Sequence, residues 1–173
     1  MPITLKTTPG GSDSNAYCTL VEADAYHESV IDNTALASWT GATDDQQNRA
    51  IVQATRLIDE LFEFDGECAS VTQALQWPRI GLLTPAGDTI DETVIPQQLK
   101  DATAELARSL MAADRTAELS SDGIESLEVG EIEINFSQAR PPRRKVLPDR
   151  VVEMIALWGS RKYSTCTVPL LRV

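Results

Sequence analysis

The residue types that most often carry chemistry are scarce in this chain and widely spaced. His27 is its one histidine, and Cys18, Cys68 and Cys166 lie far apart without a C-x-x-C pair. Zinc sites and Ser-His or Cys-His nucleophiles need these residue types in closer association. The sequence therefore predicts no metal site and no catalytic residue, and we expect His27 to be an exposed or core-edge side chain.

Other chemical motifs are equally weak. The stretch GDTIDE at residues 87–92 gathers Asp88, Asp91 and Glu92, but it lacks the register of a calcium loop, so a solvated turn is expected. No glycine-rich stretch has the spacing of a phosphate or dinucleotide loop. Paired carboxylates are plentiful in an acidic chain and single out no catalytic pair. We therefore expect a protein that is not an enzyme and uses no cofactor.

Charge divides the chain into an acidic part and a basic part. Residues 1–139 carry 7 Lys/Arg and 24 Asp/Glu, a net charge of −17, whereas residues 140–173 carry 8 and 2, a net charge of +6. An acidic body repels the phosphates of nucleic acid. We expect an acidic body over 1–139, and a basic linker, last helix and C-terminal docking tail over 140–173. Charge alone is compatible with a solvated tail or with an arm that docks on an acidic surface.

Length and composition favour one domain with a substantial core, since the chain has 173 residues and is 42% hydrophobic. No apolar run approaches the ~18 residues that span a bilayer. The start, MPITLKTTPGGSD, lacks the basic and apolar stretches of a signal peptide. The scattered cysteines favour a reducing compartment. We expect a protein that is made in the cytoplasm and does not contact membranes.

Four segments carry helix signals. Capping-box spacing opens the first two at Thr19 and Thr43, and a proline suits the first turn of each of the other two. Alternating apolar residues further predict a small β-hairpin over about 125–136, with one apolar and one Glu-rich face. The expected fold class is mostly α: a bundle of about four helices with a small β-hairpin and an extended C-terminal arm. The helices are expected at about 20–30, 44–63, 96–113 and 148–158.

A long connection over residues 66–95 contains the unusual stretch QALQWPRIGL, residues 73–82. Loops of this length inside a compact domain are usually functional or packed on their own side chains. Trp77 can bury a large apolar area, and the rigid Pro78 lowers the cost of ordering. We expect Trp77, Pro78 and Arg79 to pack the connection against the helices as an assembly motif. Arg79 would reach an acidic neighbour in the same or the next subunit.

Four stretches, in this order, carry a resemblance to a known family: SNAYCTLVEADAYH, NRAIVQATRLID, QALQWPRIGL and VIPQQLKDATAELARSL. Together they cover about residues 14–113, and the hairpin and final helix are similar more loosely. The chain resembles the phage head–tail connector (adaptor) proteins often labelled "DnaT-like ssDNA-binding". The resemblance implies a small helical protein that forms a dodecameric ring beneath the portal, extends the DNA channel and presents a platform for the tail.

The partners implied are further copies of the chain, the portal protein and a tail-side neck or tail-completion protein, in the neck of the virion. DNA would pass through without specific binding. The alternative is a single-stranded-DNA-binding accessory protein of phage replication. Against it, aromatics make up only 5% of residues and the cluster RPPRRK has no adjacent aromatic, whereas single-strand binders interleave the two types. The expected portal-binding residues are Arg143, Arg144, Lys145, Arg161, Lys162, Tyr163, Val168, Pro169, Leu170, Leu171 and Arg172.

Overall fold

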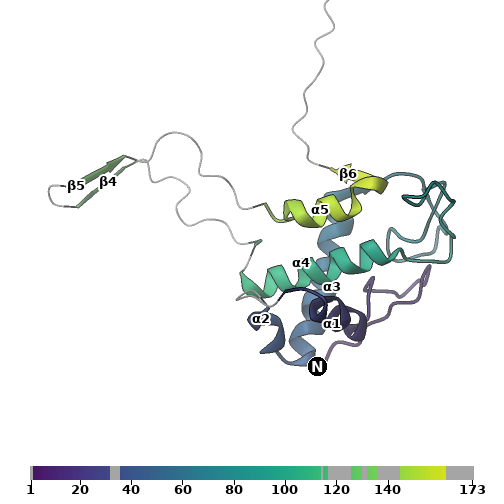
Figure 1. The fold of residues 1–173 in the computed structure, drawn as a ribbon, viewed down its shortest axis with the longest axis horizontal. Coiled ribbons are helices and arrows are strands. Elements are labelled where there is room, and N and C mark those ends of the chain that lie inside the picture. The colour runs from purple at the N-terminus through teal and green to yellow at the C-terminus, as the bar shows by residue number, and fades with distance from the viewer. Residues whose placement is uncertain are drawn as a thin grey trace, which may run out of the picture.

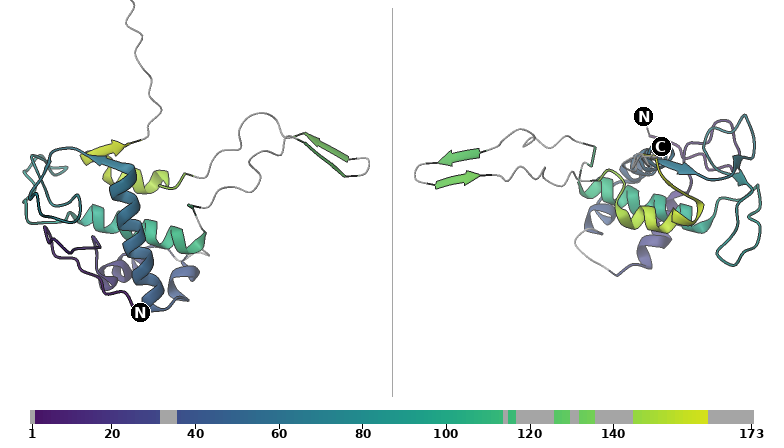
Figure 2. Two further views of the ribbon diagram at one scale, coloured as in Figure 1. Left: turned by 180° about the vertical axis from the view of Figure 1, so that it is seen from behind. Right: turned by 90° about the horizontal axis from the view of Figure 1, so that it is seen from above.

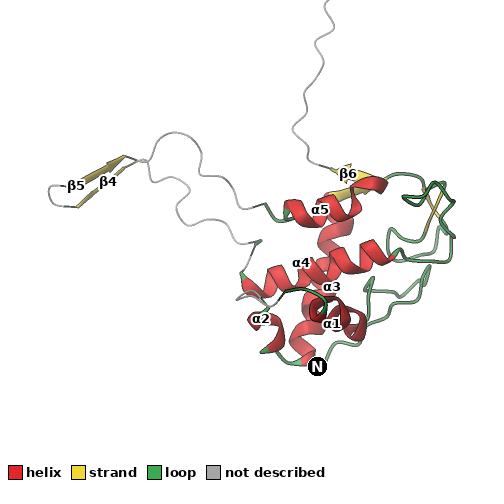
Figure 3. Ribbon diagram, viewed as in Figure 1, coloured by secondary structure: helices red, strands yellow, loops and turns green. Residues whose placement is uncertain are grey.

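The protein is mostly α-helical, as the sequence predicts (Figures 1 and 3). The computed structural model describes residues 2–31, 36–113, 115–116 and 145–162, together with the backbone of 126–129 and 132–135. The helices found there are α1 (Leu20–Glu28), α2 (Ala37–Thr40), α3 (Asp44–Leu61), α4 (Gln97–Ala112) and α5 (Asp149–Ile155), which continues into the 3-10 turn η1 (Ala156–Trp158).

Short antiparallel strand pairs join parts of the chain that are distant in sequence. β1 (Phe62–Phe64) pairs with β6 (Gly159–Arg161), which brings the C-terminal region back to the end of α3. β2 (Glu67–Cys68) pairs with β3 (Arg79–Ile80) inside the long connection. β4 (Ser126–Val129) pairs with β5 (Ile132–Asn135) and forms the expected hairpin.

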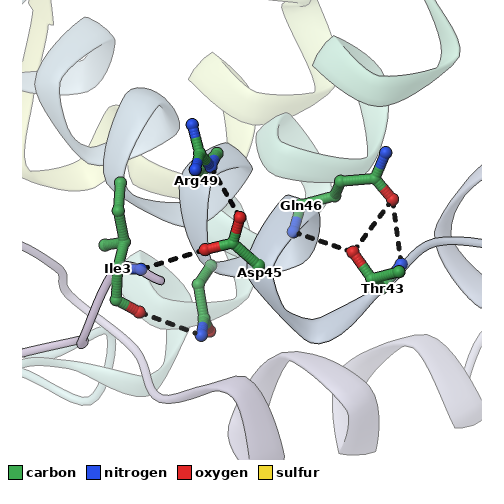
Figure 4. A network of polar contacts seen from close by, with 6 residues as sticks. Ile3, Thr43, Asp45, Gln46 and Arg49 are labelled. Carbon is green, nitrogen blue, oxygen red and sulfur yellow. Dashed lines mark hydrogen bonds and ion pairs between the residues drawn. The ribbon is translucent and has the colours of Figure 1, made fainter. Parts of the chain in front are cut away.

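The start of α3 shows how local sequence sets a helix end. Thr43 and Gln46 form the capping box that their spacing predicts, in which each side chain bonds the backbone of the other residue (Figure 4). The Asp45 carboxylate in the first turn accepts the backbone N–H of Ile3 at 3.0 Å and the Arg49 guanidinium at 2.9 Å. The N-terminal segment is therefore tied to the positive end of the helix dipole.

The core lies around α4, which packs against α1, α2, α3 and α5. In Figures 1 and 2, α3 crosses α4 rather than running alongside it, so the finer prediction of a bundle of about four helices is not confirmed. The predicted domain boundary at 139/140 lies outside the described residues. On its C-terminal side, α5 and η1 share one apolar core with the other helices through Val151, Ile155 and Trp158.

Several element ends differ from the sequence prediction. α3 stops at Leu61 and not at residue 63, because Phe62 and Phe64 turn their rings into the core from strand β1. The segment between α1 and α3, where the sequence analysis predicts no helix, contains the one-turn helix α2, which buries Trp39. Pro96 and Pro148 occupy the cap positions just before α4 and α5. The extended arm predicted after residue 162 lies outside the described residues.

Candidate assembly surfaces

Trp77 fastens the long connection to the helical core. Its side chain is 1% exposed and meets the rings of Phe64 and Trp158 edge-on, with ring centroids 5.7 and 5.5 Å apart. Such aromatic pairs add to the stabilisation that burial itself provides. The Trp77–Pro78 peptide bond is cis. The packing expected of this stretch is present, and its role in assembly stays a prediction.

The Arg79 side chain binds the backbone of the turn between β1 and β2. Its guanidinium donates to the backbone carbonyl oxygens of Asp65 at 2.6 Å, Gly66 at 2.8 Å and Gln76 at 3.2 Å. Within the chain, Arg79 thus binds backbone carbonyl groups instead of the expected acidic side chain, and a contact with the next subunit stays a prediction. The connection folds so tightly that its carbonyl groups turn inward, and the planar fork of an arginine can satisfy several of them at once.

Asp59, near the end of α3, joins three segments. Its carboxylate accepts the Tyr17 hydroxyl and, at 3.2 Å, the backbone N–H of Gln76. Its own carbonyl oxygen accepts the side-chain amide of Gln76 and the Lys162 ammonium, each at 2.6 Å. Burial raises the pKa of Asp59 to about 6, although the bonds from Tyr17 and Gln76 lower it. Through these contacts Asp59 fixes three segments to the end of α3: the N-terminal segment, the long connection and the end of the described C-terminal region.

Lys162, the last described residue, is also held to the end of α3 by its backbone. The backbone N–H of Lys162 donates to the carbonyl oxygen of Leu61 at 3.0 Å, directly after β6 pairs with β1. Gly159 begins β6 because no side chain fits there: a Cβ at this position would lie 2.0 Å from the Glu63 carbonyl oxygen. The position of the backbone at Lys162 is therefore set by the β1–β6 pairing and by its hydrogen bond to Leu61.

The segment between α4 and α5 that carries the hairpin is also anchored at its base. Arg115 donates to the Ser109 hydroxyl at 3.0 Å and to the Lys145 carbonyl oxygen at 3.3 Å. The Asp149 carboxylate accepts both the Lys145 ammonium at 2.8 Å and the Arg161 guanidinium at 2.6 Å. The hydrogen bond from Lys145 is the main reason why the pKa of Asp149 is lowered. The exposed carboxylate of Asp149 thus links Lys145, which follows the hairpin segment, to Arg161, which precedes the C-terminal segment.

Of the residues expected to bind the portal, three lie in the described part of the chain. Lys145, Arg161 and Lys162 cluster near α5 and β6, and each is engaged within the body by Asp149 or by the Asp59 carbonyl. No structural information bears on the others, which lie outside the described residues: Arg143, Arg144, Tyr163, Val168, Pro169, Leu170, Leu171 and Arg172.

The hairpin has two chemically different faces. Directly opposite residues of an antiparallel pair lie on the same face, and the register sets Leu127 opposite Ile134 and Val129 opposite Ile132. One face therefore carries four aliphatic residues. The other carries Glu128 opposite Glu133 and Ser126 opposite Asn135. Residues 130 and 131, between the two strands, lie outside the described residues.

A buried polar cluster between α1, α4 and α5 was not foreseen. Glu105 is 6% exposed and binds Arg108 at 2.5 Å and Arg150 at 3.6 Å. His27 is 2% exposed and lies between the rings of Tyr26 and Trp39, so the expectation of an exposed or core-edge histidine is wrong. Burial, aided by Arg108, lowers its pKa to about 4.

Helical spacing offered a signal for the buried glutamate, since Glu105 follows Ala102 by three positions on the face that also carries Leu99 and Leu106. The negative charge of Glu105 predicts instead that its side chain is exposed to solvent. The nearer partner, Arg108, lies three positions further along the same helix. The second partner, Arg150, comes from a helix 45 positions further along, which no local pattern reveals.

Within the described ranges, no group of three or more His, Cys, Asp or Glu side chains is placed to hold a metal ion. No described helix is both long enough and apolar enough to cross a membrane. No curated protein and no solved structure matches the chain. A family model described as "Putative DnaT-like ssDNA binding protein" matches residues 1–173. Because that match runs from the first residue to the last, the chain belongs to this family.

Proposed function

We propose that this protein is a structural head–tail adaptor of a tailed phage. It would form a ring under the portal, extend the DNA channel and join the head to a tail-side neck protein. The proposal rests on the resemblance of the segments at 14–113 to such adaptors, on the acidic charge of residues 1–139 and on the placement of the aromatic rings.

The aromatic rings are the observation that carries the proposal. Proteins that grip single-stranded nucleic acid expose aromatic side chains on which bases stack, beside unpaired basic residues. Of the seven aromatic residues in the described ranges, six are buried and the seventh, Tyr26, is half-buried with its hydroxyl near Glu105 and Arg150. A body of this kind offers single-stranded DNA no stacking surface among its described residues.

The basic side chains support the same conclusion. Lys145 and Arg161 bind Asp149, and Arg150 binds Glu105, so each of these cations already contacts a carboxylate within the body. Affinity for nucleic acid comes largely from cations that release counterions from phosphate. In an adaptor, an acidic wall would instead let DNA pass without adhering.

Single-stranded-DNA binding, as an accessory to phage replication, is the second candidate. The description of the family to which the chain belongs favours it. The sequence retains two aromatics near basic residues outside the described ranges: Phe136 precedes Arg140, and Tyr163 follows Lys162. Binding of this kind would have to use those two segments.

Two measurements separate the candidates. Fluorescence anisotropy with a labelled thymidine oligonucleotide would show no binding at micromolar protein and physiological salt if the protein is an adaptor. Micromolar affinity that falls steeply with salt would refute the adaptor proposal. In a second measurement, the portal protein of the same phage should retain the full-length chain on a column.

A deletion of residues 163–173 tests whether the C-terminal tail is the docking arm. The deletion leaves the β1–β6 pairing and the Lys162 contacts in place, so the body should stay folded, which circular dichroism can verify. Loss of portal binding is the expected result. Unchanged affinity would show that the tail is not the docking arm.

A further inference from the structure

The buried His27 lies where α1, α2 and α4 meet. Its ring packs against the rings of Tyr26 and Trp39, with centroids 5.2 and 4.6 Å apart. Neither ring nitrogen has a hydrogen-bond partner among the described residues, and the nearby Ala104 carbonyl group makes no well-aligned bond with either. Buried polar groups in proteins are nearly always paired, so an unpaired histidine at this junction needs an explanation.

The groups that face the ring favour its neutral form. The Arg108 guanidinium, on α4, opposes a positive charge on His27, whereas the carboxylates of Asp24 and Glu105 favour one. The helix α2, with the sequence ASWT, adds no charged side chain. Burial is the largest influence and Arg108 adds to it, so the pKa of His27 is lowered to about 4.

Both nearby carboxylates already have partners. Asp24 accepts the indole N–H of Trp39 at 2.9 Å. Glu105 binds Arg108 at 2.5 Å, and Arg150 of α5 lies 3.6 Å from it. A protonated ring would bring a positive charge and a second N–H donor into this site, and a buried donor without an acceptor is costly.

α2 is the element around the ring that can move most readily. Trp39 is its one buried residue, held by Asp24 and, through its carbonyl oxygen, by the Gln47 side chain at 3.0 Å. α1 is instead fixed to α4 by the ion pair between Glu22 and Lys100 at 2.5 Å. Moving the single turn of α2 aside is therefore the smallest change that gives a protonated ring access to water.

We propose that protonation of His27 releases α2 from the helical body and so makes this turn an acid-sensitive switch. Release exposes the Trp39 indole and opens a groove of about 440 Å³ between α2, the start of α3 and the end of α4. Local openings of this kind leave the rest of a structure folded. The proposal goes beyond the adaptor function, and its test involves neither portal nor DNA. The residues that line the groove are Ala37, Ser38, Gly41, Ala42, Gln46 and Met111.

The two protonation equilibria of His27 set the size of the effect. A released ring regains the ordinary pKa of 6.5, against about 4 in the closed body. The open form then binds the proton more tightly, so the closed form loses stability as pH falls from about 6.5 to 4. Between pH 7 and pH 5 the equilibrium constant for opening should rise about twentyfold.

Hydrogen exchange of the indole N–H groups, followed by NMR on the full-length chain, measures this opening. The buried Trp158 is an internal reference, because it donates its indole N–H to the Leu83 carbonyl oxygen at 2.9 Å, the same distance as from Trp39 to Asp24. After correction for the intrinsic effect of pH on exchange, the protection of Trp39 should fall about twentyfold from pH 7 to pH 5 and stay below that of Trp158. Low concentrations of urea should leave the exchange of Trp39 unchanged, because a local opening exposes little surface.

Two variants remove the titrating ring. His27→Gln keeps a polar side chain and His27→Phe keeps an aromatic ring, and neither gains a charge between pH 7 and pH 5. In both, the protection of Trp39 should not vary with pH. The matched control is Asp59→Asn, because Asp59 has a pKa of about 6 and also titrates in this range, but lies near the end of α3. This control should keep the pH dependence of the wild type.

Three results would overturn the proposal. If the protection of wild-type Trp39 changes less than about threefold between pH 7 and pH 5, the carboxylates and the attraction of the aromatic rings for a cation hold the protonated ring in place. A fall in protection that persists in both His27 variants means that another group senses the pH. Exchange of Trp39 that accelerates in low urea together with that of Trp158 means that the whole body unfolds rather than α2 alone.

Discussion

Replacing Arg79 with alanine tests whether its guanidinium holds the long connection in place. Arg79 is 8% exposed and is the donor to the carbonyl oxygens of Asp65, Gly66 and Gln76. Alanine removes all three bonds and leaves the carbonyl groups facing the space that the side chain filled. We expect the connection to loosen from the body and the free energy of unfolding to fall.

The size of the loss follows from these bonds. Hydrogen bonds to charged groups contribute about 1.5–3 kcal/mol each, and a buried acceptor left unpaired costs a further penalty. Water can enter the vacated space and satisfy part of the lost bonding, and the contact to Gln76 is the longest at 3.2 Å. We therefore expect Arg79→Ala to lower the free energy of unfolding by about 3 kcal/mol. For a chain of this length that is a fall in Tm of roughly 6–12 °C.

Equilibrium unfolding in urea, followed by tryptophan fluorescence, measures this loss, and differential scanning calorimetry gives the Tm. Arg56→Ala is the matched control, because Arg56 is an exposed arginine on the nearby helix α3, and should change stability by less than about 0.5 kcal/mol. Arg79→Lys keeps the charge and loses the planar fork, so it should restore only part of the stability. If Arg79→Ala unfolds within about 0.5 kcal/mol of the Arg56→Ala control, the carbonyl-binding role is refuted.

Three further predictions concern single residues. Burial raises the pKa of Asp59 to about 6, so the folded state holds this proton more tightly than the unfolded state. Stability from this group therefore declines as pH rises from about 4 to 6, and Asp59→Asn should lose that slope in urea titrations. The pKa of His27 is lowered to about 4, so the folding stability that neutral His27 contributes is lost as pH falls from about 6.5 to 4. An NMR titration in which the imidazolium forms near pH 6.5 would contradict this prediction. Gly159→Ala should cost about 1–3 kcal/mol, because its Cβ would meet the Glu63 carbonyl oxygen at 2.0 Å, whereas Gly41→Ala, with its nearest contact at 3.1 Å, should cost much less in the same denaturation assay.

Helix positions were readable from sequence wherever the signal was local. The capping boxes at Thr19 and Thr43 depend on residues three positions apart, and both form as predicted. The starts of α4 and α5 follow their prolines. The alternation at 125–136 predicts both the hairpin and the separation of its apolar and Glu-rich faces, which the register confirms. These features could be predicted because each depends on a few neighbouring residues.

The features that only the tertiary structure decided all join distant parts of the chain. Arg79 meets carbonyl groups rather than a carboxylate because the fold of the connection turns them inward. The β1–β6 pairing and the contact of Glu105 with Arg150 depend on α5 returning to the body after the hairpin segment. Periodicity and charge show which residues prefer to be buried or solvated. They do not show which distant group will compensate a buried charge or an unpaired carbonyl, because that depends on the path of the backbone between them.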